Sequence, residues 1–432
     1  MTHESHTSED PLDLFSSLLN RITTESIVSL ATRARQNYLQ RTSPDNSSEW
    51  VCSVPKPSCG SFNLVFKLEF SDGVSWILRI PRHTEDGHYI DRVTRFIRSE
   101  ATTMSFLRKN TSIPIPEVFE FDETVENEIG APYSLMKFVE GHIVGEVWFD
   151  SNGPTPLEER RLRILETVAS AMSQLSKFSF AEIGSLEFLE GSDIPTIRQC
   201  NVFDEAAQLA GHGDDIDETP FRKIGPFQSS TEYLEALLDM QAPTSQPYLQ
   251  GVRQLLRIMI RLLPHSDRFV LAHPDLDVQN VLVSEDGTLT ALLDWDTVRT
   301  VPQCIGYTMY PSWITRDWDH MKYGWERPNA RQENSPTELE HYRRYYASKC
   351  ITSDRDFTTK SHLYEAISIA ASSPICIGRI VRKIFEFVFP EDEQDDEECP
   401  LYLYETALAL AEGILDDESR QRLEEELKDL LE

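Results

Sequence analysis

Residues 271–280 read LAHPDLDVQN, and an Asp-Gly turn at 286–287 separates the apolar run after them from a second run that ends in DWD at 294–296. An Asp-Gly pair between two apolar runs predicts a β-hairpin. Such a hairpin would bring Asp294 back beside Asn280. The stretch therefore predicts that two acidic side chains and one amide meet at a single place.

Phosphoryl transfer requires this set of side chains. One carboxylate orients and deprotonates the attacking hydroxyl, while an amide and a second carboxylate hold Mg²⁺ on the phosphates. We predict that Asp275 is the general base and that Asn280 and Asp294 are the metal ligands. A loop Asp also often caps a backbone amide, and this is the alternative for Asp275; Asp296 could reach the metal through water or cap a turn.

The ordered pattern H-x-D-x-x-x-x-N, hairpin and D-W-D resembles the catalytic loop and metal-binding segment of the aminoglycoside phosphotransferases, choline kinases and their relatives. The resemblance implies the α+β, bilobal protein-kinase-like fold. Its small N-terminal lobe would be an antiparallel β-sheet with one main helix, and its larger C-terminal lobe would be mostly helical. ATP and Mg²⁺ are the implied cofactors and a small-molecule hydroxyl is the implied acceptor. His273 is expected to brace the loop through a hydrogen bond.

A second hairpin is predicted upstream, because apolar residues alternate over 62–70 and 74–80 around a Ser-Asp-Gly turn. The even-numbered residues would form one face, and Val65, Ile77 and Arg79 would share the other. In the fold that the chain resembles, this second face covers adenine, and the cation reaches the α- and β-phosphates. The alternative is that Arg79 only ends an exposed strand.

Residues 58–65, SCGSFNLV, resemble the glycine-rich phosphate loop of that fold. Gly60, Ser61 and Phe62 match its glycine and its tip, while Ser and Asn replace the outer glycines. The resemblance implies that these three residues lie against the nucleotide phosphates.

Arg79 occupies the position where most of these kinases have lysine. Arginine keeps the charge and adds a planar fork, so it is not an equivalent replacement. The helix that follows should supply a carboxylate to anchor this cation, and Glu100 is the predicted partner.

Residues 132–141, PYSLMKFVEG, resemble the strand that joins the two lobes. The resemblance implies that the backbone carbonyl of Lys137 and the backbone amide of Val139 bind the adenine edge.

Three departures from the family pattern leave other functions open. Arg79, Pro274 and Asp277 motivate a second hypothesis, a pseudokinase that binds nucleotide, or nothing, and serves as an interaction module. Asp277 could oppose phosphate or contact a cationic acceptor. A third hypothesis is a metal-dependent hydrolase with His273 and Asp275 as ligands, but the other histidines show no ligand spacing.

The composition limits the possible partners. The 432 residues include 72 acidic and 41 basic ones, giving a formal net charge of −31, which repels nucleic acids and anionic membranes and would attract a cationic acceptor. The start, MTHESH, lacks the features of a signal or transit peptide, and the longest apolar stretch, 367–377, is too short to span a bilayer. We therefore expect no nucleic acid partner, no membrane association and a cytoplasmic location.

Acceptor specificity is expected to lie in helical segments over 144–263 and in loops over 307–325. Aromatic loop residues there could bind a cation or simply cover the core; they are Trp313, Trp318 and Trp325.

Four segments are predicted along the chain. They are an N-terminal helical extension over 1–47, a nucleotide-binding N-lobe over 48–140, a helical C-lobe over 141–390, and an acidic linker with a C-terminal helix over 391–432. The last helix would bury a stripe of Leu423, Leu427 and Leu430.

Overall fold

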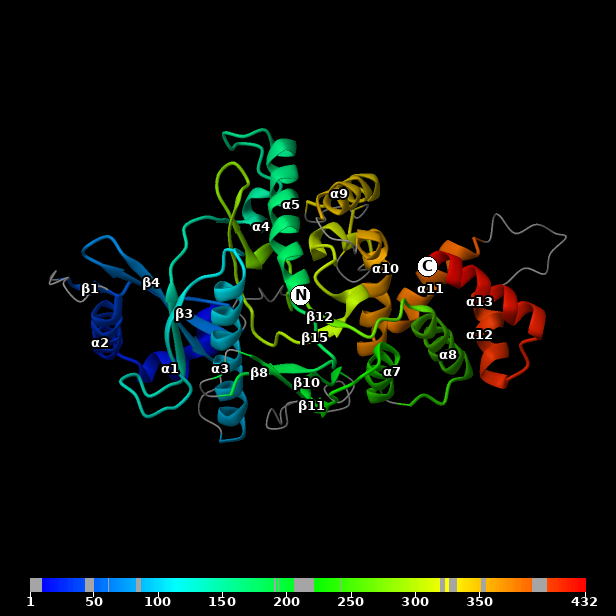
Figure 1. Ribbon diagram of the computed structural model, residues 1–432, viewed down its shortest axis with the longest axis horizontal. Coiled ribbons are helices and arrows are strands. Elements are labelled where there is room, and N and C mark those ends of the chain that lie inside the picture. The colour runs from blue at the N-terminus through cyan, green and yellow to red at the C-terminus, as the bar shows by residue number, and fades with distance from the viewer. Residues whose placement is uncertain are drawn as a thin grey trace, which may run out of the picture. The chain divides into compact units, whose positions relative to one another are not determined.

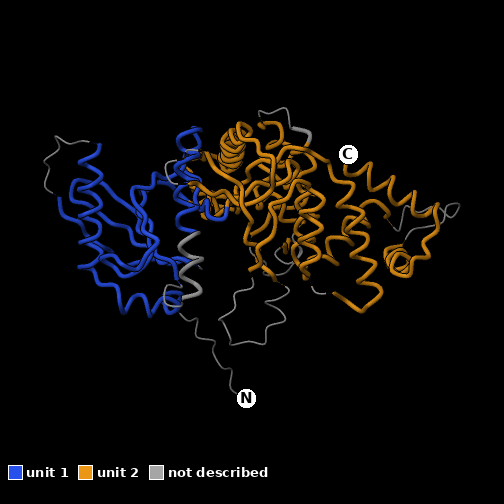
Figure 2. Tube along the Cα trace, turned by 60° about the horizontal axis from the view of Figure 1, so that its bottom comes forward, with its two compact units in different colours: residues 1–142, 290–297 blue, residues 143–289, 298–432 orange. Residues whose placement is uncertain are grey.

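Contacts divide the computed structural model into two compact units, coloured separately in Figure 2. Unit 1 comprises residues 1–142 and 290–297, and unit 2 comprises 143–289 and 298–432. The structure describes residues 10–42, 50–60, 62–82, 87–189, 192, 194–205, 221–241, 243–318, 323–325, 332–350, 355–390 and 402–432.

Unit 1 is built on one six-stranded antiparallel sheet (Figure 1). Its strand order is β1-β3-β4-β6-β5, with β2 also paired to β3. One long helix, α3 (Gly87–Asn110), connects β4 to β5. The strands are β1 (Cys52–Ser53), β2 (Ser58–Cys59), β3 (Asn63–Phe70), β4 (Ser75–Pro81), β5 (Val118–Asp122) and β6 (Tyr133–Lys137).

The β3–β4 hairpin has the predicted alternation. Leu64, Leu68 and Leu78 are fully buried, and the other even-numbered residues within the two strands are buried as well, whereas Phe62 and Val74, just outside the strands, are exposed. Val65 pairs with Arg79 across the two strands, so these residues lie on the opposite face. The hairpin therefore presents the predicted second face, and its side chains are half-buried.

The N-terminal segment packs into the core of unit 1. It forms η1 (Pro11–Phe15), α1 (Ser16–Arg21) and α2 (Thr24–Thr42). Its buried residues belong to the same apolar cluster as the sheet residues Phe70 and Trp76; they are Phe15, Leu18, Ile22, Ile27, Leu30, Ala31 and Ala34. The residues predicted as an extension thus share a core with the sheet.

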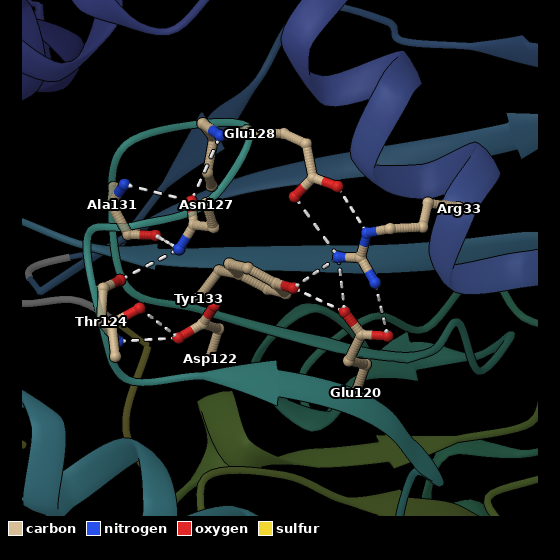
Figure 3. Close-up of polar contacts among 9 residues, drawn as sticks. Arg33, Glu120, Asp122, Thr124, Asn127, Glu128, Ala131 and Tyr133 are labelled. Atoms are coloured by element: carbon tan, nitrogen blue, oxygen red, sulfur yellow. Dashed lines mark hydrogen bonds and ion pairs between the residues drawn. The ribbon is translucent and has the colours of Figure 1, made fainter. Parts of the chain in front are cut away.

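A polar network also attaches α2 to the sheet. In Figure 3 the guanidinium of Arg33 lies between the carboxylates of Glu120 and Glu128. Arg33 Nη2 donates to Glu120 Oε1 at 2.8 Å and to Tyr133 Oη at 3.1 Å, and Tyr133 donates to Glu120 at 2.6 Å. The hydrogen bond from Arg33 lowers the pKa of Glu128, although burial opposes that effect. The network joins α2 to β5, to β6 and to the loop between them.

Unit 2 is mostly helical, and its short strands form small antiparallel pairs (Figure 1). Its helices are α4 (Val144–Val147), α5 (Leu157–Ser173), α7 (Ser230–Met240), α8 (Pro247–Leu262), α9 (Pro336–Lys349), α10 (Arg355–Ser372), α11 (Ile377–Val388), α12 (Leu403–Glu412) and α13 (Asp417–Leu431). The paired strands are β8 (Ser185–Glu187) with β9 (Thr196–Arg198), β10 (Cys200–Phe203) with β11 (Phe221–Ile224), and β12 (Phe269–Leu271) with β15 (Thr300–Pro302).

Five 3₁₀ turns and three more strands complete the described elements. They are η2 (Gln174–Lys177), η3 (Val278–Asn280), η4 (Gln303–Ile305), η5 (Ser312–Ile314), η6 (Arg316–Trp318), β7 (His142–Ile143), β13 (Val281–Val283) and β14 (Leu289–Leu292). Unit 1 combines a sheet with the two long helices α2 and α3, one more than expected for the N-lobe, and unit 2 is mostly helical, so the predicted α+β class is confirmed.

The C-terminal helices belong to the core of unit 2. Helix α12, which the sequence reasoning did not predict, lies so close to α8 that a Cβ atom on Gly251 would be 1.7 Å from the Ala407 carbonyl oxygen. On α13 the fully buried residues are Leu423, Leu427 and Leu431. The predicted third member, Leu430, is only partly buried, because the buried stripe continues at i+8, where Leu431 lies, and not at i+7.

Near the end of the predicted helical C-lobe, the chain forms two helices, α10 and α11, because Pro374 cannot continue the first. Most of the predicted acidic linker, residues 391–401, lies outside the described residues. No helix among the described residues has both the length and the apolar character needed to cross a bilayer.

Candidate active site

The cation of β4 forms the centre of a charged cluster in unit 1. Arg79 Nη1 donates to Glu100 Oε1 at 2.5 Å, and Arg79 Nη2 donates to Asp294 Oδ1 at 3.0 Å. Glu100 comes from α3, so the predicted ion pair is present. The Arg79 side chain is 16% exposed and that of Glu100 is 8% exposed, which makes the pair a largely desolvated one.

Electrostatics keep Arg79 charged despite its burial. Burial lowers the pKa of Arg79, but the carboxylates of Glu100 and Asp294 outweigh this effect and hold the pKa above its ordinary value. Burial also raises the pKa of Glu100, and the charge of Arg79 opposes that rise. The arginine thus compensates for two acidic groups whose own mutual repulsion is unfavourable.

The segment that carries Asp294 has an uncommon backbone. Asp294 and Thr297 have φ angles of 62° and 55°, in the left-handed region that few residues other than glycine adopt. The N–H of Leu292 donates to the Pro114 carbonyl at 2.8 Å, and the fully buried Trp295 donates from Nε1 to the Leu292 carbonyl. Because such conformations cluster at functional sites, this strained and well-anchored segment agrees with a role for Asp294.

The predicted catalytic loop is tightly organised within unit 2. Asn280 Nδ2 donates to both the backbone oxygen and Oδ2 of Asp275, at 2.8 and 2.9 Å. Gln279 Nε2 donates to the same Oδ2 at 3.0 Å, a contact that the sequence reasoning missed. The Asp275 carboxylate is therefore fixed by two side-chain amides of the 3₁₀ turn η3.

These contacts also set the orientation of the Asn280 amide. Its nitrogen is used by Asp275, so its oxygen is the remaining acceptor. The oxygen makes no hydrogen bond within the described part of the chain. Amide and carboxylate oxygens are ligands that Mg²⁺ accepts, so Asn280 in unit 2 and Asp294 in unit 1 are each of a suitable chemical type, and their roles as metal ligands stay predictions.

The remaining loop residues support this arrangement. The Asp275 N–H donates to Nδ1 of the buried His273 at 3.2 Å, which is the expected bracing contact. The Asp277 side chain accepts from the Val278 N–H at 2.8 Å and so caps η3. Asp277 therefore has a local structural role in addition to the roles considered for it.

The predicted turn after the loop is present. The Gly287 N–H donates to the Ser284 carbonyl, and the Ser284 N–H donates to the Thr288 carbonyl, each at 2.9 Å. Hydrogen bonds from the Ser284 hydroxyl, the Thr288 N–H and Arg163 lower the pKa of Asp286 at its tip.

The structure describes the residues predicted to bind nucleotide, with the exception of Ser61. The Gly60 N–H donates to the Asn63 carbonyl at 3.0 Å, and Phe62 is 76% exposed, whereas Ser61 lies outside the described residues. Lys137 is exposed at the end of β6, and Val139 is half-buried beyond it. The roles of these residues, and those of Val65 and Ile77, stay predictions.

A cavity of about 250 Å³ lies beside Asp275 within unit 2. It is lined by Asp275, Asp277, Ser312, Thr315, Arg316, Trp318, His362, Glu365, Ala366, Ile369, Cys376, Arg379 and Ile380. A smaller cavity of about 90 Å³ shares Asp275, Ser312 and Glu365 with it. Asp275, the predicted base, thus lines both cavities.

Of the three tryptophans considered for acceptor binding, one lines this cavity. It is Trp318, and Lys383 Nζ lies 4.1 Å from the centre of its ring. Trp313 is buried and Trp325 is 45% exposed. The polar lining residues Arg316 and His362 had no sequence signal, because they come from η6 and α10, far apart in the chain.

The described residues contain no group of three or more His, Cys, Asp or Glu side chains placed to hold a metal. The ligand cluster that a metal-dependent hydrolase with His273 and Asp275 would need is thus not found among them.

Comparisons with known proteins agree with this geometry. The chain is 26% identical over 326 residues to a subtelomeric hrmA-associated cluster protein of Aspergillus fumigatus, covering 62% of each protein. It is 28% identical over 296 residues to altered inheritance of mitochondria protein 9 of Zygosaccharomyces rouxii, covering 56% of this chain and 47% of the relative. The chain therefore spans about half to three fifths of the length of these relatives.

Among solved structures, the ethanolamine kinase of Plasmodium vivax is similar with a TM-score of 0.39 and 10% identity, over 98% of each chain. The model of the phosphotransferase enzyme family matches residues 56–304, more than half of the chain, and this range includes the Arg79 cluster, the catalytic loop and the DWD segment. The sheet with α3, followed by a mostly helical unit, is the protein-kinase-like fold expected from the sequence. The chain belongs to the phosphotransferase enzyme (APH) family.

Proposed function

We propose that the protein is an ATP- and Mg²⁺-dependent phosphotransferase that transfers the γ-phosphoryl group to a hydroxyl of a small molecule. The observation that supports this most strongly is the Asp275 carboxylate, which two amide side chains fix in the wall of a cavity. General bases must be held within hydrogen-bond reach of the proton that they accept. A loop aspartate that only capped a backbone amide would not need two side-chain amides to orient its carboxylate.

In this proposal Asp275 acts on the acceptor. The acceptor hydroxyl donates a hydrogen bond to the carboxylate, which takes the proton as the hydroxyl oxygen bonds to the γ-phosphorus. The bond between that phosphorus and the β,γ-bridging oxygen breaks, and ADP leaves with the electron pair. Phosphorylated acceptor and ADP are the products.

In this proposal the nucleotide is bound by residues of the predicted N-lobe together with Asn280 and Asp294. Arg79 binds the α- and β-phosphates, Val65 and Ile77 cover adenine, and the backbone of Lys137 and Val139 binds its edge. Gly60, Ser61 and Phe62 close over the phosphates, and Glu100 holds Arg79. Asn280 and Asp294 bind Mg²⁺, which when bound would neutralise charge on the phosphates.

The decisive experiment replaces the base. Asp275→Asn keeps the shape of the side chain and should lower acceptor-dependent ADP release about 10²- to 10⁴-fold, because general-base catalysis contributes about that much. The assay is a panel of hydroxylated and amino-alcohol metabolites screened with the wild type, followed by kcat measurements on the best acceptor.

The matched control is Asp239→Asn, which makes the same replacement on α7 at a side chain that is 62% exposed. This variant should keep wild-type turnover. Equal kcat values for Asp275→Asn and the wild type would remove Asp275 from the mechanism.

A second candidate function is a pseudokinase that binds nucleotide, or nothing, and serves as an interaction module. It is favoured by Arg79, which stands where most kinases of this type have lysine, and by Pro274 and Asp277 in the loop. The ion pairs of Arg79 with Glu100 and Asp294 are compatible with either function. Binding of Mg-ATP without transfer to any acceptor would favour the pseudokinase.

The cellular location also stays a proposal. The features of the residues MTHESH favour the cytoplasm, whereas one similar protein is named as mitochondrial. Fluorescence of a tagged full-length protein in cells, compared with a mitochondrial marker, would distinguish the two compartments.

A further inference from the structure

The cavity beside Asp275 is lined by charges of both signs. Asp275, Asp277 and Glu365 contribute carboxylates, and Arg316 and Arg379 contribute guanidinium groups. A purely cationic acceptor would find favourable partners only among the acids. The presence of arginine in this lining therefore requires an explanation, and it is sought at Arg316.

Arg316 is the more informative of the two. It is half-buried in the lining and makes no hydrogen bond or ion pair with another described residue. Its sequence neighbour Asp317 is already used, because Arg343 binds that carboxylate through two nitrogens at 2.7 and 3.1 Å. In a chain with 72 acidic and 41 basic residues, a half-buried arginine that none of the described carboxylates pairs with is suited to bind an anionic ligand.

His362 of the lining carries no charge of its own near pH 7. Burial, followed by the charges of Arg343 and Lys383, lowers the pKa of His362 from 6.5 to about 3, so its imidazole is neutral. Arg343 is paired with Asp317 and does not line the cavity. An anion in the cavity would therefore be attracted to Arg316, which does line it.

The aromatic lining does not favour a ligand cation. Lys383 Nζ lies over the Trp318 ring at 4.1 Å, so the protein itself supplies the cation for that ring. The edge of the same ring contacts His362, with ring centres 5.2 Å apart. The Trp318 ring therefore already contacts a cation of the protein itself and is not left for a ligand cation.

We propose that the acceptor is a small hydroxylated anion, whose carboxylate or phosphate group binds Arg316 while its hydroxyl faces Asp275. This inference rests on the proposed function and specifies its substrate class. A cavity of about 250 Å³ lies below the ~300–1,000 Å³ of sites for drug-sized ligands, so it suits a molecule of about one sugar ring. Arg316 is here a specificity-determining residue and not part of the chemical step.

The test uses four probes that share one pyranose ring and differ in charge. They are D-glucuronate and D-glucose 6-phosphate as anions, D-glucose as the neutral compound and D-glucosamine as the cation. Their dissociation constants for the full-length wild type, without nucleotide, are measured by calorimetry at constant ionic strength. At least one anion should bind about tenfold or more tightly than glucose, as expected for one charge-assisted hydrogen bond, and glucosamine should bind most weakly.

The preference for the anion should then depend on Arg316. Arg316→Ala should reduce it to about twofold or less, whereas Arg344→Ala, which removes the same charge from a side chain that is 79% exposed, should leave it unchanged. Thermal unfolding of each variant confirms that it is folded. Comparison of glucuronate with glucose 6-phosphate separates a carboxylate from a phosphate ligand.

Three outcomes would overturn the inference: tightest binding of glucosamine, no anion binding more tightly than glucose, or a preference that survives Arg316→Ala. The failure of the proposed function is distinguishable from these. Binding of an anion that depends on Arg316, without phosphate transfer to any acceptor, would leave the anion site in place and remove the kinase activity. Transfer of phosphate to a cationic alcohol and to no other acceptor would support the kinase activity and contradict the anion site.

Discussion

Arg79 binds two carboxylates at once, which a lysine would do less well. Its separate Nη1 and Nη2 groups donate to Glu100 and Asp294 respectively, from one rigid planar fork. A lysine ammonium is a single point charge on a flexible stem, so it would hold the two carboxylates less firmly. The arginine is therefore suited to fixing the DWD segment as well as to binding phosphate.

Removal of Arg79 should destabilise the fold as well as impair nucleotide binding. Arg79→Ala leaves the buried Glu100 without its partner, and we expect a loss of about 3 kcal/mol in the free energy of unfolding. The measurement is urea denaturation followed by tryptophan fluorescence. Arg79→Lys should recover more than half of that loss, because the charge returns.

The control for this prediction is Arg98→Ala in the same unit. Arg98 is 54% exposed and pairs with Glu123, so its loss should cost no more than about 1 kcal/mol. Similar losses for Arg79→Ala and Arg98→Ala would mean that the buried ion pair does not stabilise unit 1.

Single residues were predictable where a local pattern fixes their neighbours. Glu100 could be paired with Arg79 because a helix after the hairpin must present one face to it. Gln279, which donates to the Asp275 carboxylate, and Arg316 and His362, which line the cavity, could not be predicted. Their positions depend on how loops and helices distant in sequence pack, and no short spacing records this.

At the scale of elements, α2 is the helix whose importance the sequence understated. Its apolar residues enter the same core as the sheet, and the Arg33 network holds its outer face (Figure 3). The sequence showed its amphipathic pattern but not which surface would cover it. A helical period predicts a buried stripe without identifying the partner.

We expect Leu30→Ala to destabilise unit 1 strongly. Leu30 is fully buried on α2, and truncation of a buried leucine to alanine costs about 2–5 kcal/mol. Leu14→Ala is the matched control, since Leu14 is 49% exposed on η1 and its truncation should cost less than about 1 kcal/mol. Urea denaturation compares the two variants, and equal small losses would show that α2 is only loosely attached.

The accuracy of element prediction followed the strength of the periodic signal. Strict alternation located β3 and β4 to within about one residue, because a sheet buried on one face fixes the period at two. The C-terminal stripe was wrong at Leu430, since i+7 and i+8 are nearly equivalent on a helix and packing against the core decides between them. Helix α12 gave no distinctive pattern, because its apolar residues cover most of its circumference.

At the scale of the whole molecule, net charge does not describe the charges of one cavity. The chain carries a formal charge of −31, yet the cavity beside Asp275 is lined by Arg316 and Arg379 as well as by three acidic residues. Net charge predicts long-range repulsion of nucleic acids, but it does not predict which charges line a particular site. The proposal of an anionic acceptor therefore rests on Arg316 and not on the composition.

Nucleotide binding should appear as a gain in stability of the whole protein. A ligand that binds only the native state raises the free energy of unfolding by about 2.7 kcal/mol at 100 times its dissociation constant. We expect Mg-ATP to raise the melting temperature in thermal unfolding, and chelation of Mg²⁺ by EDTA to remove most of this rise, because Asn280 and Asp294 are proposed to bind the nucleotide through the metal. Asp275→Asn should keep the full shift, since the base does not hold the nucleotide. A melting temperature unchanged by millimolar Mg-ATP would favour an interaction module without nucleotide, and an equal shift with EDTA would remove the metal from the binding step.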